Sequence, residues 1–131
     1  MLRSVLAVIA GYLAMMVAVT TFFSFMVYVV LGGLPSDPKQ FSPPAWLYVV
    51  ELATTPIVAG VGGYVCAWIA KRRVMRHVFA LGGVMLVMTI VSTVGAPASD
   101  PWWHMPAIGI LGAIGAILGG RVRLAHRDAT T

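Results

Sequence analysis

Four long apolar runs constrain what this chain can fold into. They cover approximately residues 4–31, 46–70, 78–94 and 103–122. Each run is long enough to cross the hydrocarbon core of a bilayer as a helix, which takes about 17 to 25 residues. Backbone polar groups cannot be left unpaired in lipid, so such runs are expected to be helical. The sequence therefore predicts an all-α integral membrane protein, with residues 1–131 forming a single transmembrane domain of four helices.

Composition agrees with a membrane-embedded chain. Hydrophobic residues make up 60% of the sequence and charged residues only 10%, whereas soluble domains contain about 25% charged residues. A net charge of +5 would suggest nucleic-acid binding in a soluble protein. Here the basic residues flank the apolar runs, where membrane topology and anionic lipid explain them, and we expect no nucleic-acid partner. With Cys66 as the only cysteine, no intrachain disulfide can form.

The distribution of basic residues predicts how the chain faces the membrane. Lys39 would lie on one side, and the other eight lysines and arginines on the opposite side: Arg3, Lys71, Arg72, Arg73, Arg76, Arg121, Arg123 and Arg127. Short loops rich in Lys and Arg stay in the cytoplasm. We therefore predict an antiparallel bundle in the cytoplasmic membrane, with both termini inside and residues 32–45 and 95–102 outside.

The second and fourth runs resemble each other. Each begins near Pro and Trp, passes through a glycine-rich segment and ends in basic residues. One interpretation is that the chain consists of two helical hairpins in tandem. The other is that topology rules alone place Trp at the outer end of a span and Arg at the inner end.

Small residues recur at spacings that favour close helix packing. Such patterns let two helix backbones approach each other in a membrane. They occur in the first, second and fourth runs, at Gly11, Ala14, Ala59, Gly62, Gly63, Gly109, Gly112, Ala116 and Gly119. Because these faces exceed what one four-helix bundle needs, we predict a homo-oligomer or docking onto a larger membrane protein.

Glu51 is the first candidate functional residue, because it is the one acid placed inside an apolar run. Ionisable residues within spans are costly and usually face the bundle interior or water. At helical spacing Glu51 shares a face with Thr55, and Pro56, which must disturb the helix, follows directly. The alternative interpretation is an interfacial carboxylate that reaches the outer water.

Asp100 and His104 are the second candidate, on the same predicted side as Glu51. The three side chains together could bind a cation or relay a proton. The alternative is a loop with an Asp-Pro turn and an interfacial histidine. One histidine is too few for a metal site, and the methionines suit irregular packing, so we predict no metal and no other cofactor.

The basic loop after the second run is expected to contact anionic lipid headgroups through Lys71, Arg72, Arg73 and Arg76. No catalytic motif is present, so we do not expect an enzyme. Two function classes remain. The first is an accessory or structural membrane protein that acts through helix packing in an oligomer. The second is a small transporter or channel that uses Glu51 in an outward-facing cleft to bind an ion or a proton.

Overall fold

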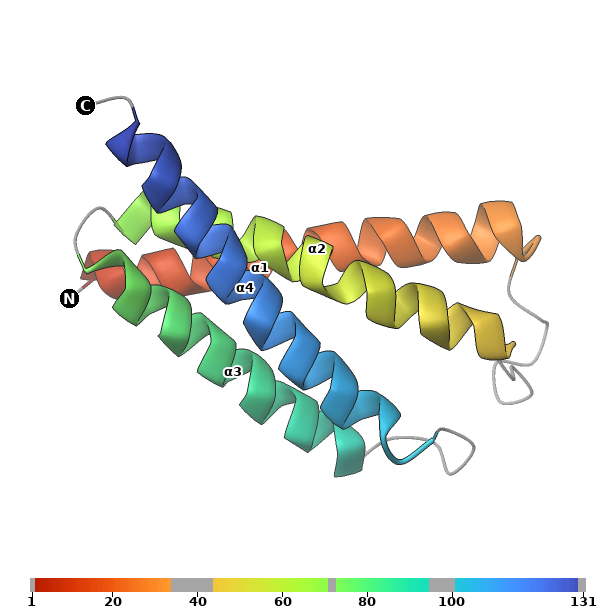
Figure 1. The fold of residues 1–131 in the computed structure, drawn as a ribbon. Helices are drawn as coiled ribbons and strands as arrows, with labels where there is room; N and C mark the ends of the chain where they lie inside the picture. Colours follow the sequence, from red (N-terminus) through yellow and green to blue (C-terminus); the bar gives the residue numbers. More distant parts are fainter. Residues whose placement is uncertain (1, 34–43, 71–72, 95–100, 130–131) are drawn as a thin grey trace.

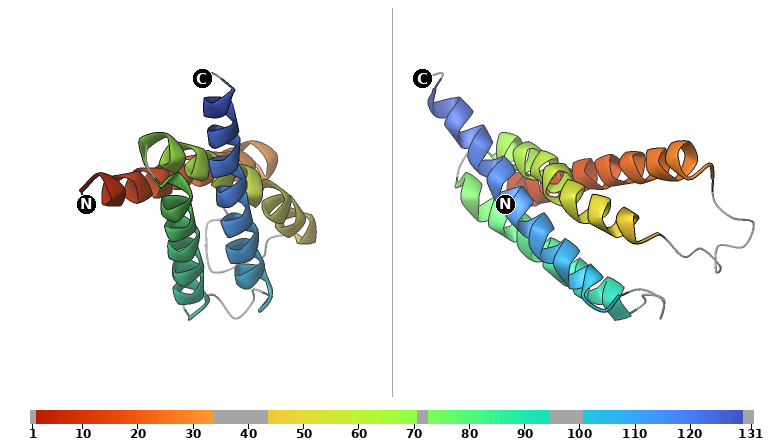
Figure 2. Two further views of the ribbon diagram at one scale, coloured as in Figure 1. Left: turned by 60° about the vertical axis from the view of Figure 1, so that its left-hand side comes forward. Right: turned by 45° about the vertical axis from the view of Figure 1, so that its right-hand side comes forward.

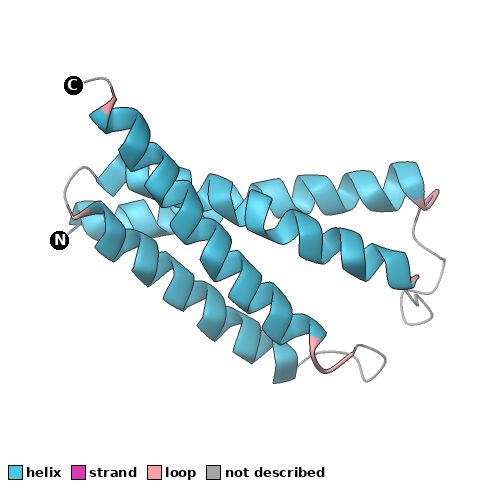
Figure 3. Cartoon of the chain, in the orientation of Figure 1, coloured by secondary structure: helices cyan, strands magenta, loops and turns pink. Residues whose placement is uncertain are grey.

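The computed structural model describes residues 2–33, 44–70, 73–94 and 101–129, and the only regular secondary structure within these ranges is helical (Figure 3). Its elements are α1 (Leu2–Phe25), which continues into the π-helix η1 (Met26–Val30), then α2 (Ala45–Ala70), α3 (Val74–Val94) and α4 (His104–Asp128). Each of the four long helical segments in these ranges is apolar and long enough to cross a membrane. The prediction of helices with four candidate spans is thereby confirmed for the described residues, and such helices are compatible with a membrane protein.

Two helices extend beyond the predicted apolar runs. α3 begins at Val74 rather than near residue 78, and α4 continues to Asp128 rather than ending near residue 122. Helical hydrogen bonding does not stop where hydrocarbon ends, and charged side chains can extend from a helix into water. At the end of α4, His126 and Arg127 also favour the helix because cations interact well with its carboxyl end.

The helix α2 is the centre of the packing. It contacts α1 on one side and α4 on another, while α3 packs mainly on α4 and touches α1 only slightly. Figures 1 and 2 show that the α1–α2 pair and the α3–α4 pair diverge toward one end of the molecule, which is at the right in Figure 1. The start of α1 and the end of α4 lie at the opposite end.

Where α2 crosses α4, the two backbones are in direct contact. A methyl group added at Gly63 would collide with the backbone of Ala116, and one added at Gly119 would collide with that of Gly60. A methyl group at Gly115 would meet the backbone of Pro56. Only glycine permits this approach. We call the set Gly60, Gly63, Gly115 and Gly119 the glycine contact.

The contact between α1 and α2 is nearly as close. A methyl group at Gly11 would lie 2.8 Å from the carbonyl oxygen of Gly62, and one at Gly62 would lie 2.7 Å from that of Gly11. Cys66 is fully buried beside them. Ala14 lies on the same helix as Gly11 and is half-buried.

The remaining predicted packing residues also face other helices of the same chain. Ala59 and Ala116 are buried in the core. On α4, Gly109 faces Thr89 of α3, and Gly112 faces the methyl group of Met85. These small residues therefore contact other helices of the same chain.

Candidate functional site

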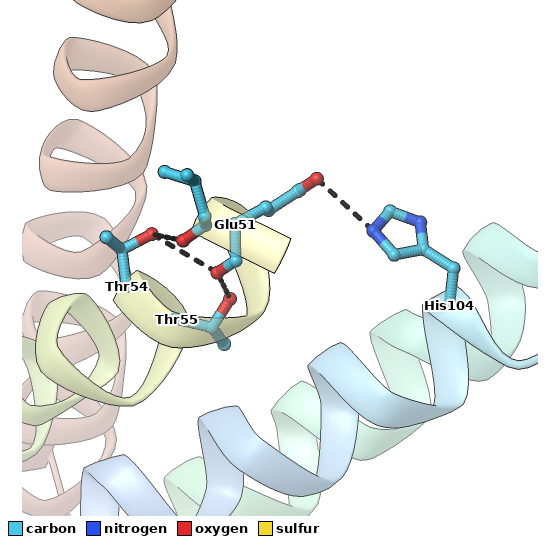
Figure 4. A network of polar contacts seen from close by, with 5 residues as sticks. Glu51, Thr54, Thr55 and His104 are labelled. Atoms are coloured by element: carbon cyan, nitrogen blue, oxygen red, sulfur yellow. Dashed lines mark hydrogen bonds and ion pairs between the residues drawn. The ribbon is translucent and has the colours of Figure 1, made fainter. Parts of the chain in front are cut away.

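Glu51 and His104 meet between two helices at the diverging end of the bundle. Glu51 lies in the second turn of α2, and His104 is the first residue of α4. The Nε2 atom of His104 is 3.2 Å from the Oε2 atom of Glu51 (Figure 4). The His104 side chain is only 4% exposed, whereas that of Glu51 is 39% exposed. The carboxylate of Glu51 therefore lies at the edge of the packed interior, and the imidazole of His104 is buried next to it.

The imidazole of His104 is held by aromatic neighbours rather than by hydrogen bonds. The ring of Tyr48 lies edge-on at 4.6 Å between centroids, and that of Trp103 at 6.0 Å. Glu51 is close but not aligned for a hydrogen bond, and neither ring nitrogen has a hydrogen-bond partner among the described residues. An unsatisfied buried polar group costs about 1–3 kcal/mol. Protonating His104 would convert this contact into an ion pair.

Next to the pair, a cavity of about 340 Å³ is lined by side chains from all four long helices. Its lining comes from the later turns of α1 and α3 and the earlier turns of α2 and α4, and so belongs to the diverging end. The lining residues that carry polar groups are Tyr12, Glu51, Thr54, Thr55, Thr89 and Ser92, and the others are apolar. No lysine or arginine is among the described lining residues.

Thr54 and Thr55 bind the helix backbone just before Pro56. The Thr55 hydroxyl donates to the carbonyl oxygen of Glu51 at 2.6 Å, and the Thr54 hydroxyl lies 2.8 Å from that of Val50 (Figure 4). A threonine hydroxyl reaches the carbonyl three or four residues back, which is at Val50 and Glu51.

Of the sequence candidates, the structure brings Glu51, Thr55 and His104 together. Asp100 lies outside the described residues, as do Lys71 and Arg72 of the basic loop. No group of three or more His, Cys, Asp or Glu side chains in the described ranges is placed to hold a metal ion.

Sequence reasoning missed two parts of this site. It did not place Tyr48 and Trp103 around His104, because aromatic residues near a span end were interpreted as interfacial anchors. It also treated the methionines as scattered filler, although six of the eight in the chain line this one cavity: Met15, Met16, Met26, Met85, Met88 and Met105. Comparing how deep each methionine lies in its span could have revealed the cluster.

The chain matches no protein-family model, no curated protein and no solved structure. Its function must therefore be inferred from the geometry of the site.

Proposed function

We propose that this protein is a small membrane transporter in which Glu51 binds the transported cation or a coupled proton. One observation carries the proposal: the only carboxylate in the apolar part of the described helices lines a cavity and touches a buried histidine. Intramembrane acids that face a cavity usually mark substrate or ion pathways. A carboxylate serving only as an interfacial anchor would need neither the cavity nor the histidine.

The charge distribution supports an orientation for this transporter. Glu51 lies near the start of α2, and the described arginines lie near the other end of the bundle, at Arg73, Arg76, Arg121, Arg123 and Arg127. By the positive-inside rule that end faces the cytoplasm. We therefore propose an antiparallel bundle in the cytoplasmic membrane, with both termini inside, the cavity toward the outside and the basic end against anionic headgroups.

The alternative is an accessory membrane protein that packs against a second copy or a larger membrane protein. Its sequence support was an excess of small residues. Those residues pack between helices of one chain, notably at Gly11, Gly62, Gly63 and Gly119. The geometry therefore favours the transporter over the accessory protein.

Flux through proteoliposomes tests the proposal. The purified protein is reconstituted with a pH gradient, and proton movement is followed with an enclosed pH-sensitive dye as cations are added outside. We expect Glu51→Gln to slow the wild-type flux by about tenfold or more, because a charge-assisted contact worth about 1.5–3 kcal/mol is lost. Asp128→Asn, which removes an exposed carboxylate at the far end of α4, should leave the flux unchanged.

Two outcomes would count against transport. One is an equal flux in wild-type and Glu51→Gln vesicles. The other is no flux above protein-free vesicles for any cation tested.

A further inference from the structure

The cavity beside Glu51 combines one carboxylate and a few hydroxyl groups with a mainly apolar, adaptable lining, and this combination specifies a class of ligand. The inference rests on the proposed transporter and names its substrate class. Three properties of the cavity support the inference: the uncompensated charge of Glu51, the chemistry of the lining residues and the side from which a solute enters the cavity.

The charge of Glu51 is not balanced by a permanent positive charge in the described structure. Ala70 at the end of α2 is 19 positions beyond Glu51, about 28 Å of helix, and the arginines near α2 begin only beyond that point. Along α4, Arg121 is about 26 Å from His104. The one basic group in contact is His104, which carries charge only when protonated. A ligand with one positive charge would complete the site.

The walls suit large apolar groups of variable shape. Six methionines line the cavity, and methionine is the side chain that best adapts to irregular partners because it is unbranched and polarisable. Phe22, Phe23 and Tyr12 add aromatic rings on the α1 side, and aromatic faces attract organic cations. A volume of about 340 Å³ is within the range of sites for small organic molecules.

The exposed part of the lining lies on α1 and α3. Met16, Val19 and Phe23 of α1 and Met88 of α3 are each more than 40% exposed, and all four line the cavity. These two helices touch only slightly. In a membrane these apolar side chains face lipid, so the cavity is reached laterally from the hydrocarbon. That route admits a solute that partitions into lipid and excludes a hydrated inorganic ion.

We infer that the cavity binds a lipophilic organic monocation, with Glu51 holding the charge and the methionine and aromatic walls holding the apolar groups. A divalent cation would remain half-neutralised, because Glu51 is the one carboxylate among the described lining residues. A neutral apolar molecule would leave the Glu51 charge without a partner.

Equilibrium binding to the purified full-length protein in lipid nanodiscs tests the inference. The probe is tetraphenylphosphonium, compared with neutral triphenylphosphine oxide and with hydrophilic tetramethylammonium. We expect wild-type protein to bind tetraphenylphosphonium at least about tenfold more tightly than either comparison compound, and Glu51→Gln to lose about tenfold in affinity. Protein-free nanodiscs give the partitioning background for each compound.

A matched pair of substitutions tests whether binding occurs in this cavity. Ser92 and Thr93 are adjacent, exposed hydroxyl residues of α3 that each bond the carbonyl four residues back. Ser92 lines the cavity, whereas Thr93 does not. Ser92→Phe should fill the cavity and reduce tetraphenylphosphonium binding by about tenfold, while Thr93→Phe should bind like wild type. Circular dichroism checks that both variants are folded.

The outcomes separate this inference from the proposed function. Glu51-dependent proton or inorganic-cation flux without tetraphenylphosphonium binding would overturn the substrate class and leave transport standing. Tetraphenylphosphonium binding without any flux would support the ligand class and remove transport. Equal affinity for triphenylphosphine oxide, equal binding by Glu51→Gln, or equal losses in Ser92→Phe and Thr93→Phe would each overturn the inference.

Discussion

The two regions along α2 are packed in opposite ways. At Gly60 and Gly63, its backbone lies directly against that of α4, and no side chain separates the two helices. Two to three turns earlier, Glu51 contacts α4 through the side chain of His104 and lines a cavity whose walls include six methionines. The helix α2 therefore takes part both in a backbone contact with α4 and in the lining of the cavity.

The difference shows that a short chain can combine a closely packed region with one that contains a cavity. Backbone contact in a membrane fixes helix positions through dense van der Waals packing. Methionine side chains can change conformation at little cost. We interpret the glycine contact as the part that holds the bundle together and the cavity as the part that adapts, so substitutions in the two regions should have very different consequences.

The largest effect is expected from adding one methyl group to the glycine contact. In Gly119→Ala, the new Cβ collides with the backbone of Gly60, which cannot move without shifting α2. We expect the free energy of unfolding to fall by more than about 3 kcal/mol, at the upper end of overpacking costs. The measurement is the midpoint of unfolding in mixed SDS micelles.

Gly83→Ala is the matched control for that substitution. Gly83 is on α3, is exposed, and has no heavy atom within 4 Å of the added methyl position. Its unfolding free energy should change by no more than about 1 kcal/mol, the difference in helix propensity between Gly and Ala. Equal losses in both variants would show that α2 and α4 do not cross as described.

An intermediate effect is expected in thiol accessibility. Cys66 is fully buried between α1 and α2, whereas Ser92 is exposed and lines the cavity. A membrane-permeant maleimide should therefore label Ser92→Cys, in a Cys66→Ala background, at least about tenfold faster than it labels Cys66 in the wild type. Mass spectrometry of timed samples gives both rates. Rapid labelling of Cys66 would show that the contact between α1 and α2 opens as readily as the cavity does.

The smallest effect is expected where a glycine faces a methionine. In Gly112→Ala, the added methyl group meets the end of the Met85 side chain, which can rotate toward the cavity. The loss of stability should stay near about 1 kcal/mol, at the lower end of overpacking costs. The same SDS titration used for Gly119→Ala measures it. A loss as large as that of Gly119→Ala would mean that the cavity walls are as rigid as the glycine contact.

The sequence was sufficient to predict four helices long and apolar enough to span a membrane. Runs such as 46–70 and 103–122 are too apolar to be stable in water. In lipid, a single segment pairs all its backbone N–H and C=O groups only when it forms a helix. It was less informative about where helices end, because the charged continuations of α3 and α4 lie outside the apolar runs. It singled out Glu51 because an acid in such a run is rare.

The tertiary structure decided which partners these residues have. Glu51 and His104 come from different helices, and only the packing of α2 on α4 sets their separation of 3.2 Å. The same packing decides which helices the small residues bring together, and it gathers methionines that are distant in sequence around one cavity. The physical reason is that hydropathy determines whether a segment lies in the membrane, whereas contacts between helices depend on how their surfaces fit together.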